Sequence, residues 1–149
     1  MITVVVVIDQ VIKFIIVDSL FNSSIRIIDG VLSFTYVENN GGAYGIGNDS
    51  TFMFIIVSLV IIILIIKFIL SKNNSIPIHI LFNLGLIVAG GIGNLIDRIF
   101  RGFVIDYIDF NSIIKYPVFN LADICVVIGC LIIGINLIIN LIKERKKLQ

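Results

Sequence analysis

The chain consists mostly of long apolar runs separated by short polar segments. A helix that crosses a membrane needs about 20 consecutive, mainly apolar residues. Four runs approach or exceed that length: residues 2–20, 51–70, 76–96 and 117–142. The pattern therefore predicts an all-α polytopic membrane protein, in which residues 1–149 form a single integral-membrane domain with four transmembrane helices.

The first run is the least regular, because Asp9, Gln10 and Lys13 interrupt it. A cleaved secretory signal would begin with basic residues and end at a small-residue cleavage site. The chain shows neither feature and starts almost directly in this run. We therefore expect a retained first helix that is either short and tilted or preceded by further residues from an upstream start codon.

The composition agrees with a membrane protein. Of the 149 residues, 58% are hydrophobic and 14% are charged, and the mean hydropathy is +1.13. Soluble domains carry about 45–50% apolar and about 25% charged residues. The Ile and Val runs would favour strands in water, but at these lengths in lipid a helix pairs every backbone amide within its own segment. A net charge of +1 leaves no surplus of Lys and Arg for a nucleic-acid partner.

Basic residues are concentrated in two short segments. The tail 143–147 contains four basic residues and one acid, and Lys67 and Lys72 flank the link 71–75. The segment 21–50 has one basic residue and three acids. Because Lys and Arg in short loops stay on the cytoplasmic side, the sequence predicts cytoplasmic N- and C-termini and two longer connections that face outward.

The residue inventory excludes several common reaction centres. His79 is the only histidine and lies at the inner end of the third run, so a zinc site of the H-E-x-x-H type cannot form. The chain has no G-x-S-x-G segment, and the glycines in 41–45 lack the Lys-Ser/Thr end of a phosphate-binding loop. Cys125 and Cys130 lack the spacing of a redox or zinc pair, and we interpret them as small buried apolar side chains. We expect neither a metal nor a cofactor.

Polar residues gather at the predicted outer end of the third run. Asn94, Asp97 and Arg98 stand at i, i+3 and i+4, which predicts that they share one helical face. Charged groups within a span are costly and tend to be functional, but a polar helix cap with an ordinary ion pair would also explain these three. A stripe of small residues in the same run would let another helix approach closely: Gly85, Ala89 and Gly93.

Two aspartates follow at the same predicted surface. Asp106 lies in the segment 101–110, where acids alternate with large apolar residues as in an interfacial strand or turn. Asp123 is expected to share a helical face with Asn120, although a helix N-terminus alone would also favour such a carboxylate. Two carboxylates held close in a poorly hydrated place cannot both ionise easily. The ionised one can take a proton from water while the protonated one binds the scissile carbonyl, which is metal-free peptide hydrolysis.

Four blocks resemble those of one family, lipoprotein signal peptidase, also called signal peptidase II. They occur in the family's order: Asp9-Gln10-x-x-Lys13, 39–45 (NNGGAYG), 90–98 (GGIGNLIDR) with Val104 and Asp106, and 119–123 (FNLAD). Each block alone is weak, whereas together they cover most of the chain and are highly specific.

The resemblance implies that Asp106 and Asp123 are the catalytic pair of an aspartic endopeptidase. It implies support of the site and of the substrate backbone at further polar positions: Asn39, Asn94, Asp97, Arg98, Asn120, Asp9 and Lys13. The implied fold has four transmembrane helices, a small extracytoplasmic β-like cradle and a short interfacial helix. The segment 21–50 has the length and mixed polarity for that cradle.

The resemblance also implies the partners of the reaction. The substrates would be prolipoproteins in the bacterial cytoplasmic membrane, cut just before a diacylglyceryl-modified cysteine once the lipid has been added. Membrane lipid and globomycin-type peptide inhibitors would be the other ligands.

Some features depart from the family pattern or suit other functions. Gly42 stands where the family usually has Ala, and Tyr44 where it usually has Phe. Asn39 and its glycines would also suit a plain surface turn. A carrier or channel subunit would place acids at mid-membrane depth on several helices, which only Asp9 approaches. A second class of intramembrane aspartyl protease would need G-x-G-D, where this chain has GIGN at 91–94. A purely structural membrane protein would not need two outward carboxylates.

Overall fold

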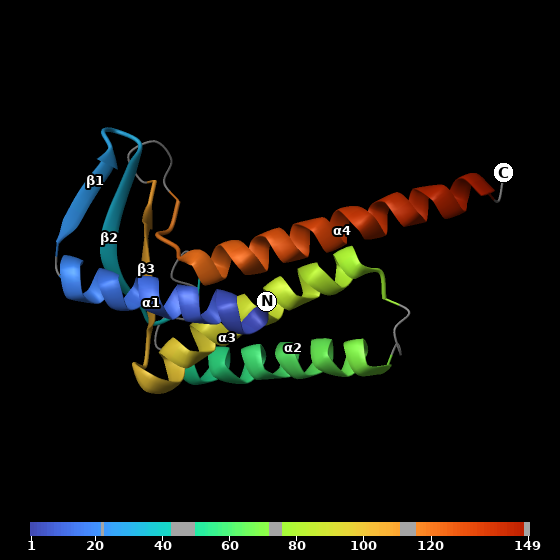
Figure 1. The fold of residues 1–149 in the computed structure, drawn as a ribbon, viewed down its shortest axis with the longest axis horizontal. Helices are drawn as coiled ribbons and strands as arrows, with labels where there is room; N and C mark the ends of the chain where they lie inside the picture. Colours follow the sequence, from blue (N-terminus) through green and yellow to red (C-terminus); the bar gives the residue numbers. More distant parts are fainter. Residues whose placement is uncertain (22, 43–49, 72–75, 111–115, 148–149) are drawn as a thin grey trace.

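The computed structural model describes residues 1–21, 23–42, 50–71, 76–110 and 116–147. These residues form helices and a small sheet that lies at one end of the molecule, where α1 and α3 end and α4 begins (Figure 1). In chain order the elements are α1 (Ile2–Leu20), β1 (Ser24–Ile28), β2 (Leu32–Asn39), α2 (Thr51–Ser71), α3 (Ile78–Phe100), β3 (Val104–Asp109) and α4 (Leu121–Lys147).

Three helices in the described part of the chain, α2, α3 and α4, are long and apolar enough to cross a membrane. Helix α1 has the predicted bounds but is not among them. Asp9, Lys13 and Asp18 break its apolar run. The expectation of a mostly helical membrane protein is therefore confirmed, with three of the four expected spans supported by length and composition.

The last two helices differ from the predicted spans at the end nearest the sheet. Helix α3 continues about one turn beyond its predicted end. The prediction that the last span starts at Pro117 was wrong, because residues 117–120 lie outside α4. Phe119 instead pairs with Ile108 of β3. Asn120 therefore precedes the helix and does not share a helical face with Asp123.

Helix α3 is the centre of the bundle and packs against α1, α2 and α4. Its small residues allow close contacts, as the stripe predicts. A Cβ on Gly93 would stand 2.6 Å from Asp9 Oδ2 of α1. A Cβ on Gly90 would overlap the carbonyl oxygen of Ala122 on α4. The two glycines thus set how closely α1 and α4 approach the half of α3 that lies near the sheet.

The three strands form an antiparallel sheet in the order β1-β2-β3. Successive side chains of a strand face opposite sides of the sheet. Ile105 and Tyr107 of β3 are buried against Ile16 and Leu20 of α1. Asp106 lies between them in sequence and so faces the other side. The packing of β3 on α1 therefore determines the direction in which Asp106 points.

The sheet corresponds to the β-like cradle that the resemblance implies. Strands β1 and β2 come from the segment 21–50, and the alternating segment 101–110 supplies the third strand. The expected interfacial helix has no counterpart among the described elements. Residues 43–49, which include Tyr44, and residues 72–75, which include Lys72, lie outside the described part of the chain.

We expect Gly90→Ala to destabilise the protein, because the added Cβ overlaps the Ala122 carbonyl oxygen and forces α3 and α4 apart. Overpacking of this kind costs about 1–3 kcal/mol. Gly134→Ala is the matched control, since a Cβ there meets nothing within 4 Å, and alanine stabilises an open helical position by up to about 1 kcal/mol. Thermal unfolding of both purified variants in the same detergent measures the difference. Equal melting temperatures would show that Gly90 does not limit the approach of the helices.

Candidate active site

Asp106 lies on β3 and is only 2% exposed. Each of its carboxylate oxygens accepts a hydrogen bond from an asparagine. Asn39 Nδ2 donates to Oδ2 at 2.8 Å, and Asn120 Nδ2 donates to Oδ1 at 2.7 Å. Asn39 is the last residue of β2 and pairs with Val104, so it shares a face of the sheet with Asp106. The pairing of β2 with β3 therefore brings the Asn39 amide to the carboxylate.

Asp123 is held in the first turn of α4 by reciprocal hydrogen bonds with Asn120. The backbone N–H of Asp123 donates to Asn120 Oδ1 at 2.9 Å, and the backbone N–H of Asn120 donates to Asp123 Oδ2 at 3.2 Å. Two side chains thus satisfy two N–H groups at the helix end, which is a capping box. The remaining oxygen, Asp123 Oδ1, accepts a hydrogen bond from Asn94 Nδ2 at 2.7 Å. The helix-terminal interpretation of Asp123 is correct, and the same contacts orient its carboxylate.

Asn120 connects the two carboxylates. Its side chain is completely buried. Its Oδ1 caps α4 beside Asp123, while its Nδ2 donates to Asp106 and also to Asn94 Oδ1 at 3.1 Å. A single amide therefore fixes the placement of an aspartate on β3 relative to an aspartate on α4.

Tyr107 contributes to the site and was missed from the sequence. Its Oη accepts a hydrogen bond from the backbone N–H of Leu121 at 3.2 Å, while its ring packs against α1. Burial raises the pKa of Tyr107 to about 12, so the hydroxyl group stays neutral. The signal was available in the alternation of 103–110, which places Tyr107 on the face of the strand opposite Asp106.

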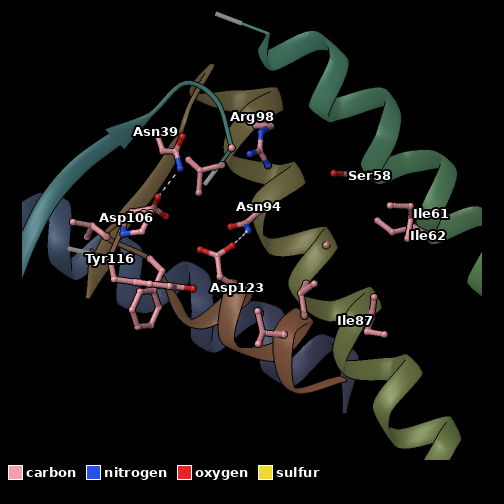
Figure 2. A pocket seen from close by; sticks show the side chains of 18 residues that line it. Asn39, Ser58, Ile61, Ile62, Ile87, Asn94, Arg98, Asp106, Tyr116 and Asp123 are labelled. Carbon is pink, nitrogen blue, oxygen red and sulfur yellow. Dashed lines mark hydrogen bonds between the residues drawn. The ribbon is translucent and has the colours of Figure 1, made fainter. Parts of the chain in front are cut away.

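The two aspartates border one cavity of about 320 Å³ (Figure 2). Figure 2 shows Asn39 directed at Asp106 and Asn94 directed at Asp123. Arg98 completes the charged lining on the α3 side. The rest of the lining is mainly apolar and comes from the loop after β2, the three apolar helices, β3 and the segment before α4: Gly42, Ser58, Ile61, Ile62, Ile87, Gly91, Val104, Tyr116, Pro117, Val118, Phe119, Val126 and Val127.

An apolar hollow of about 310 Å³ also reaches Asp123. It is lined almost entirely by large apolar side chains: Phe110, Tyr116, Phe119, Ile124, Val127 and Ile128. Val127 and Ile128 are exposed on the surface of α4, so the hollow opens on a side of the helix that lipid would cover. Asp123 thus borders both the cavity that it shares with Asp106 and an apolar hollow.

Arg98 fixes the chain that follows β2. Its Nη2 donates to the carbonyl oxygen of Gly41 at 3.0 Å, and its guanidinium carbon lies 5.1 Å from the ring centroid of Phe54 on α2. Asn39 Oδ1 closes a turn by accepting the N–H of Gly41 at 2.9 Å. Asn39 therefore closes a turn and also donates a hydrogen bond to Asp106. The remainder of the NNGGAYG block, 43–45, lies outside the described residues.

The Asp106 carboxyl group binds its proton strongly. Burial raises the pKa of Asp106 from 3.8 to about 7, and the nearby charge of Asp123 adds to the effect. Hydrogen bonds from Asn39 and Asn120 act in the opposite direction and are outweighed. Asp106 is therefore mostly protonated at any pH below about 7.

Four of the predicted site residues do not line the cavity: Asn120, which precedes α4, and three residues that lie behind the cavity. Asp9 and Lys13 of α1 and Asp97 of α3 are no more than 1% exposed. Lys13 Nζ lies 2.9 Å from Asp9 Oδ2 and 2.8 Å from Asp97 Oδ2. Asn94 and Asp97 both contact Lys13, in keeping with the predicted shared face, whereas Arg98 lies about 100° further round α3 from Asp97. Arg98 faces the cavity, whereas Asp97 faces α1.

The side chains that could bind a metal are not gathered in the described part of the chain. No group of three or more His, Cys, Asp or Glu side chains there is placed to hold a metal ion. Cys125 is buried, but Cys130 is exposed, so the prediction that both are buried was wrong. The reason is that no described residue covers that side of α4.

Comparison with known proteins decides the class of the molecule. The family described as "Signal peptidase (SPase) II" matches residues 1–139. The chain belongs to this family. The lipoprotein signal peptidase of Halothermothrix orenii is 39% identical over 127 residues, which cover 85% of this chain and 84% of the relative. The lipoprotein signal peptidase of Clostridioides difficile (strain 630) is 41% identical over 140 residues, which cover 92% of this chain and 91% of the relative.

Solved structures agree with the family assignment. A structure described as "Bacterial membrane enzyme structure by the in meso method at 2.3 A resolution" has a TM-score of 0.84 and 34% identity, covering 92% of this chain and 84% of that one. A second, described in the same words at 1.9 A resolution, has a TM-score of 0.81 and 35% identity, covering 91% of this chain and 88% of that one. Membership in the signal peptidase II family makes the protein a peptidase, and this membership together with the three long apolar helices makes it a bacterial membrane protein.

Proposed function

We propose that the protein is an aspartic endopeptidase of the cytoplasmic membrane that removes signal peptides from prolipoproteins. One observation carries the proposal. Two aspartates, the buried Asp106 on β3 and the half-buried Asp123 on α4, border one cavity, and asparagine amides hold both carboxylates. The relatives named lipoprotein signal peptidase support the substrate class.

The surroundings of the two aspartates support different roles. Asp106 has a pKa of about 7, which suits a proton donor. Asp123, like Asp106, accepts hydrogen bonds at both oxygens, in its case from Asn94 and from the backbone of Asn120. It also lies at the N-terminus of α4, where the helix dipole favours a negative charge. We therefore assign Asp123 as the general base and Asp106 as the general acid.

In the proposed reaction, Asp123 takes a proton from water while the water oxygen attacks the scissile carbonyl carbon. Asp106 gives its proton to the carbonyl oxygen, which yields a neutral tetrahedral intermediate. When the carbon–nitrogen bond breaks, the leaving amine takes the proton from Asp123, and the hydroxyl proton of the intermediate returns to Asp106. One water is consumed, and both carboxyl groups recover their starting states.

Arg98 and Asn39 are placed to bind the substrate backbone beside the aspartates. Both line the cavity. The Nη2 of Arg98 holds the Gly41 carbonyl oxygen, and its buried Nε has no hydrogen-bond partner among the described residues. We assign Asp9, Lys13 and Asp97 to support of the site, since they do not line the cavity.

We assign α1 as the fourth membrane span. A charge within a span is tolerated when it faces the protein and is paired. Asp9 and Lys13 are paired and buried, whereas the outward side chains of α1, such as Val7, Val11 and Phe14, are apolar and exposed. With four spans and a basic tail, both termini are cytoplasmic, and the sheet and the cavity lie near the outer surface.

The apolar hollow supports recognition of a lipid-modified cysteine. It shares Asp123 with the cavity and opens on the outer side of α4. A peptide bound at the aspartates would therefore place the acyl chains of its cysteine in the hollow, where each buried methylene contributes about 0.8 kcal/mol. Globomycin-type peptides would inhibit by occupying the same cavity.

The positions of the acids do not support an ion path. A carrier would need acids at several depths. Helix α2 contains no acid, and between Asp123 and Glu144 there is none in α4. Asp9 and Asp97 share Lys13, and Asp97 also pairs with Arg101, so both acids are already neutralised at the end of the bundle that carries the sheet.

We expect Asp106→Asn and Asp123→Asn each to abolish cleavage of a diacylglyceryl-modified prolipoprotein without preventing folding, because each removes one of the two proton carriers. Asp29→Asn, in the exposed turn between β1 and β2, is the control and should cleave at the wild-type rate. Initial rates of the purified variants in detergent, with and without a globomycin-type inhibitor, provide the measurement. Near wild-type turnover by either aspartate variant would contradict the two-aspartate mechanism.

We expect an unmodified prolipoprotein to be cut far more slowly than the diacylglyceryl form of the same sequence. Without acyl chains the substrate loses the apolar contacts of the hollow. The values of kcat/KM for the two forms, measured with one enzyme preparation, make the comparison. Equal values would mean that the hollow holds no acyl chain.

We expect activity to fall as the pH rises through about 7, because Asp106 must keep its proton to act as the acid. Its pKa in the folded protein lies above the ordinary 3.8, so the protonated form persists up to about pH 7 and is lost above it. The contribution of this group to folding stability has the same sign and is also lost as the pH rises through that value. A profile of kcat/KM against pH tests the assignment; activity that rises through pH 7 would reverse the roles of the two aspartates.

A further inference from the structure

Lys13 makes three polar contacts in a place with no access to water. Its side chain is 0% exposed. Its Nζ lies 2.9 Å from Asp9 Oδ2, 2.8 Å from Asp97 Oδ2 and 3.0 Å from Asn94 Oδ1. An ammonium group has three donors and no acceptor. All three donors are therefore used, and the atom of the Asn94 amide that faces Lys13 has to be the oxygen.

This requirement fixes which way the Asn94 amide points. Its oxygen also accepts a hydrogen bond from Asn120 Nδ2 at 3.1 Å. Its nitrogen is then left to donate to Asp123 Oδ1 at 2.7 Å. A flipped Asn94 would set its NH₂ group against two other donors and its oxygen against the carboxylate of Asp123.

The charge of Lys13 is balanced close to where it lies. Asp9 and Asp97 both contact it, and Asp97 is shared with Arg101, whose Nε lies 3.3 Å from Oδ1. Gln10 Nε2 also donates to Asp97 Oδ1 at 3.3 Å. Two positive and two negative groups thus form a neutral cluster behind the cavity. The Asn94 amide connects this cluster to the Asp123 carboxylate, and Asp9 Oδ1 accepts the backbone N–H of the neighbouring Ala122.

We propose that Lys13 is a positioning residue of the peptidase: by holding the oxygen of Asn94, it keeps the Asn94 nitrogen as a donor to Asp123 and so keeps Asp123 ready to accept a proton from water. The inference rests on the proposed function of Asp123 as the general base. Lys13 itself does not line the cavity and touches no reacting atom.

Other charged or titratable groups also surround Asp123 and have to be held constant in a test. Helix α2 presents none to the cavity among its described residues. The groups that face Asp123 from the other elements are Asp106 and Tyr107 on β3, Arg98 on α3, Lys13 and Asp9 on α1, and Tyr116 before α4.

The test variant is Asp9→Asn combined with Lys13→Met, measured as the pH profile of kcat/KM on a diacylglyceryl-modified prolipoprotein. Removing one positive and one negative group keeps the interior neutral and leaves Asp97 with Arg101 and Gln10. We expect the acid limb of the profile to move upward by about half a pH unit or more, which is a loss of roughly threefold in relative activity below the midpoint. Lys67→Met, on an exposed lysine of α2, is the matched control and should keep the wild-type midpoint.

The route through Asn94 has its own test. In an Asn94→Ala background, the double substitution should move the acid limb no further, because the amide that transmits the effect is absent. A shift of the same size in that background would overturn the proposal. So would a folded, active double variant whose midpoint equals that of the wild type. A purely structural role for Lys13 would lower activity equally at every pH.

If the test variant fails to fold, the proposal is tested on the wild-type protein instead. With ¹⁵N-labelled asparagine, the Asn94 NH₂ signals are assigned by their loss in Asn94→Ala. We expect one orientation of the amide, with signals that shift on Asp123→Asn. Two exchanging orientations, or no response, would overturn the proposal. Failure of the wild type to cleave any lipid-modified prolipoprotein would instead refute the proposed function.

Discussion

The site depends on how the backbone N–H groups at the start of α4 are satisfied. A helix leaves its first N–H groups without partners inside the helix, and in a bilayer each unsatisfied group costs several kcal/mol. Three consecutive N–H groups, beginning at Leu121, donate to Tyr107 of β3, Asp9 of α1 and the Asn120 cap. The contacts that complete the helix therefore also hold α1, β3 and α4 together. The two aspartates stay side by side because the helix has to be capped at that point.

The charges behind the cavity are tolerated because the positive and negative groups neutralise one another. Asp9 and Asp97 would each be costly alone in an apolar bundle, and so would Lys13. Removing one member of a buried ion pair typically costs about 3–5 kcal/mol, because the partner is left without compensation. The close approach of α1 to Gly93 is what allows Asp9 and Lys13 to reach α3. In this part of the fold, the charges can neutralise one another only because small residues let the helices pack closely.

Much of the fold and of the site could be predicted from the sequence, because both follow from the cost of polar groups in lipid. Run length alone located the helices, and the same cost singled out Asp106 and Asp123. The errors arose where tertiary contacts decide the outcome. Asn120 was predicted inside a helix because apolar residues precede it, but pairing of Phe119 with β3 stops the helix short. Asp97 faces α1 and Arg98 faces the cavity because of the neighbours that each side chain meets. No local sequence pattern encodes those neighbours.

The cavity joins two parts of the fold that are built independently. The side that carries the two aspartates belongs to β3 and α4, which the helix cap and the sheet hold together. Its opposite wall includes Ser58, Ile61 and Ile62 of α2, a helix that packs mainly on α3 and exposes most of its surface. The exposed Ile61 on that wall can change in size without disturbing the hydrogen bonds of either aspartate, whereas Ile62 belongs to a buried cluster with Val88 and Leu95. The breadth of substrates that such an enzyme accepts can therefore evolve, or be engineered, separately from its chemistry.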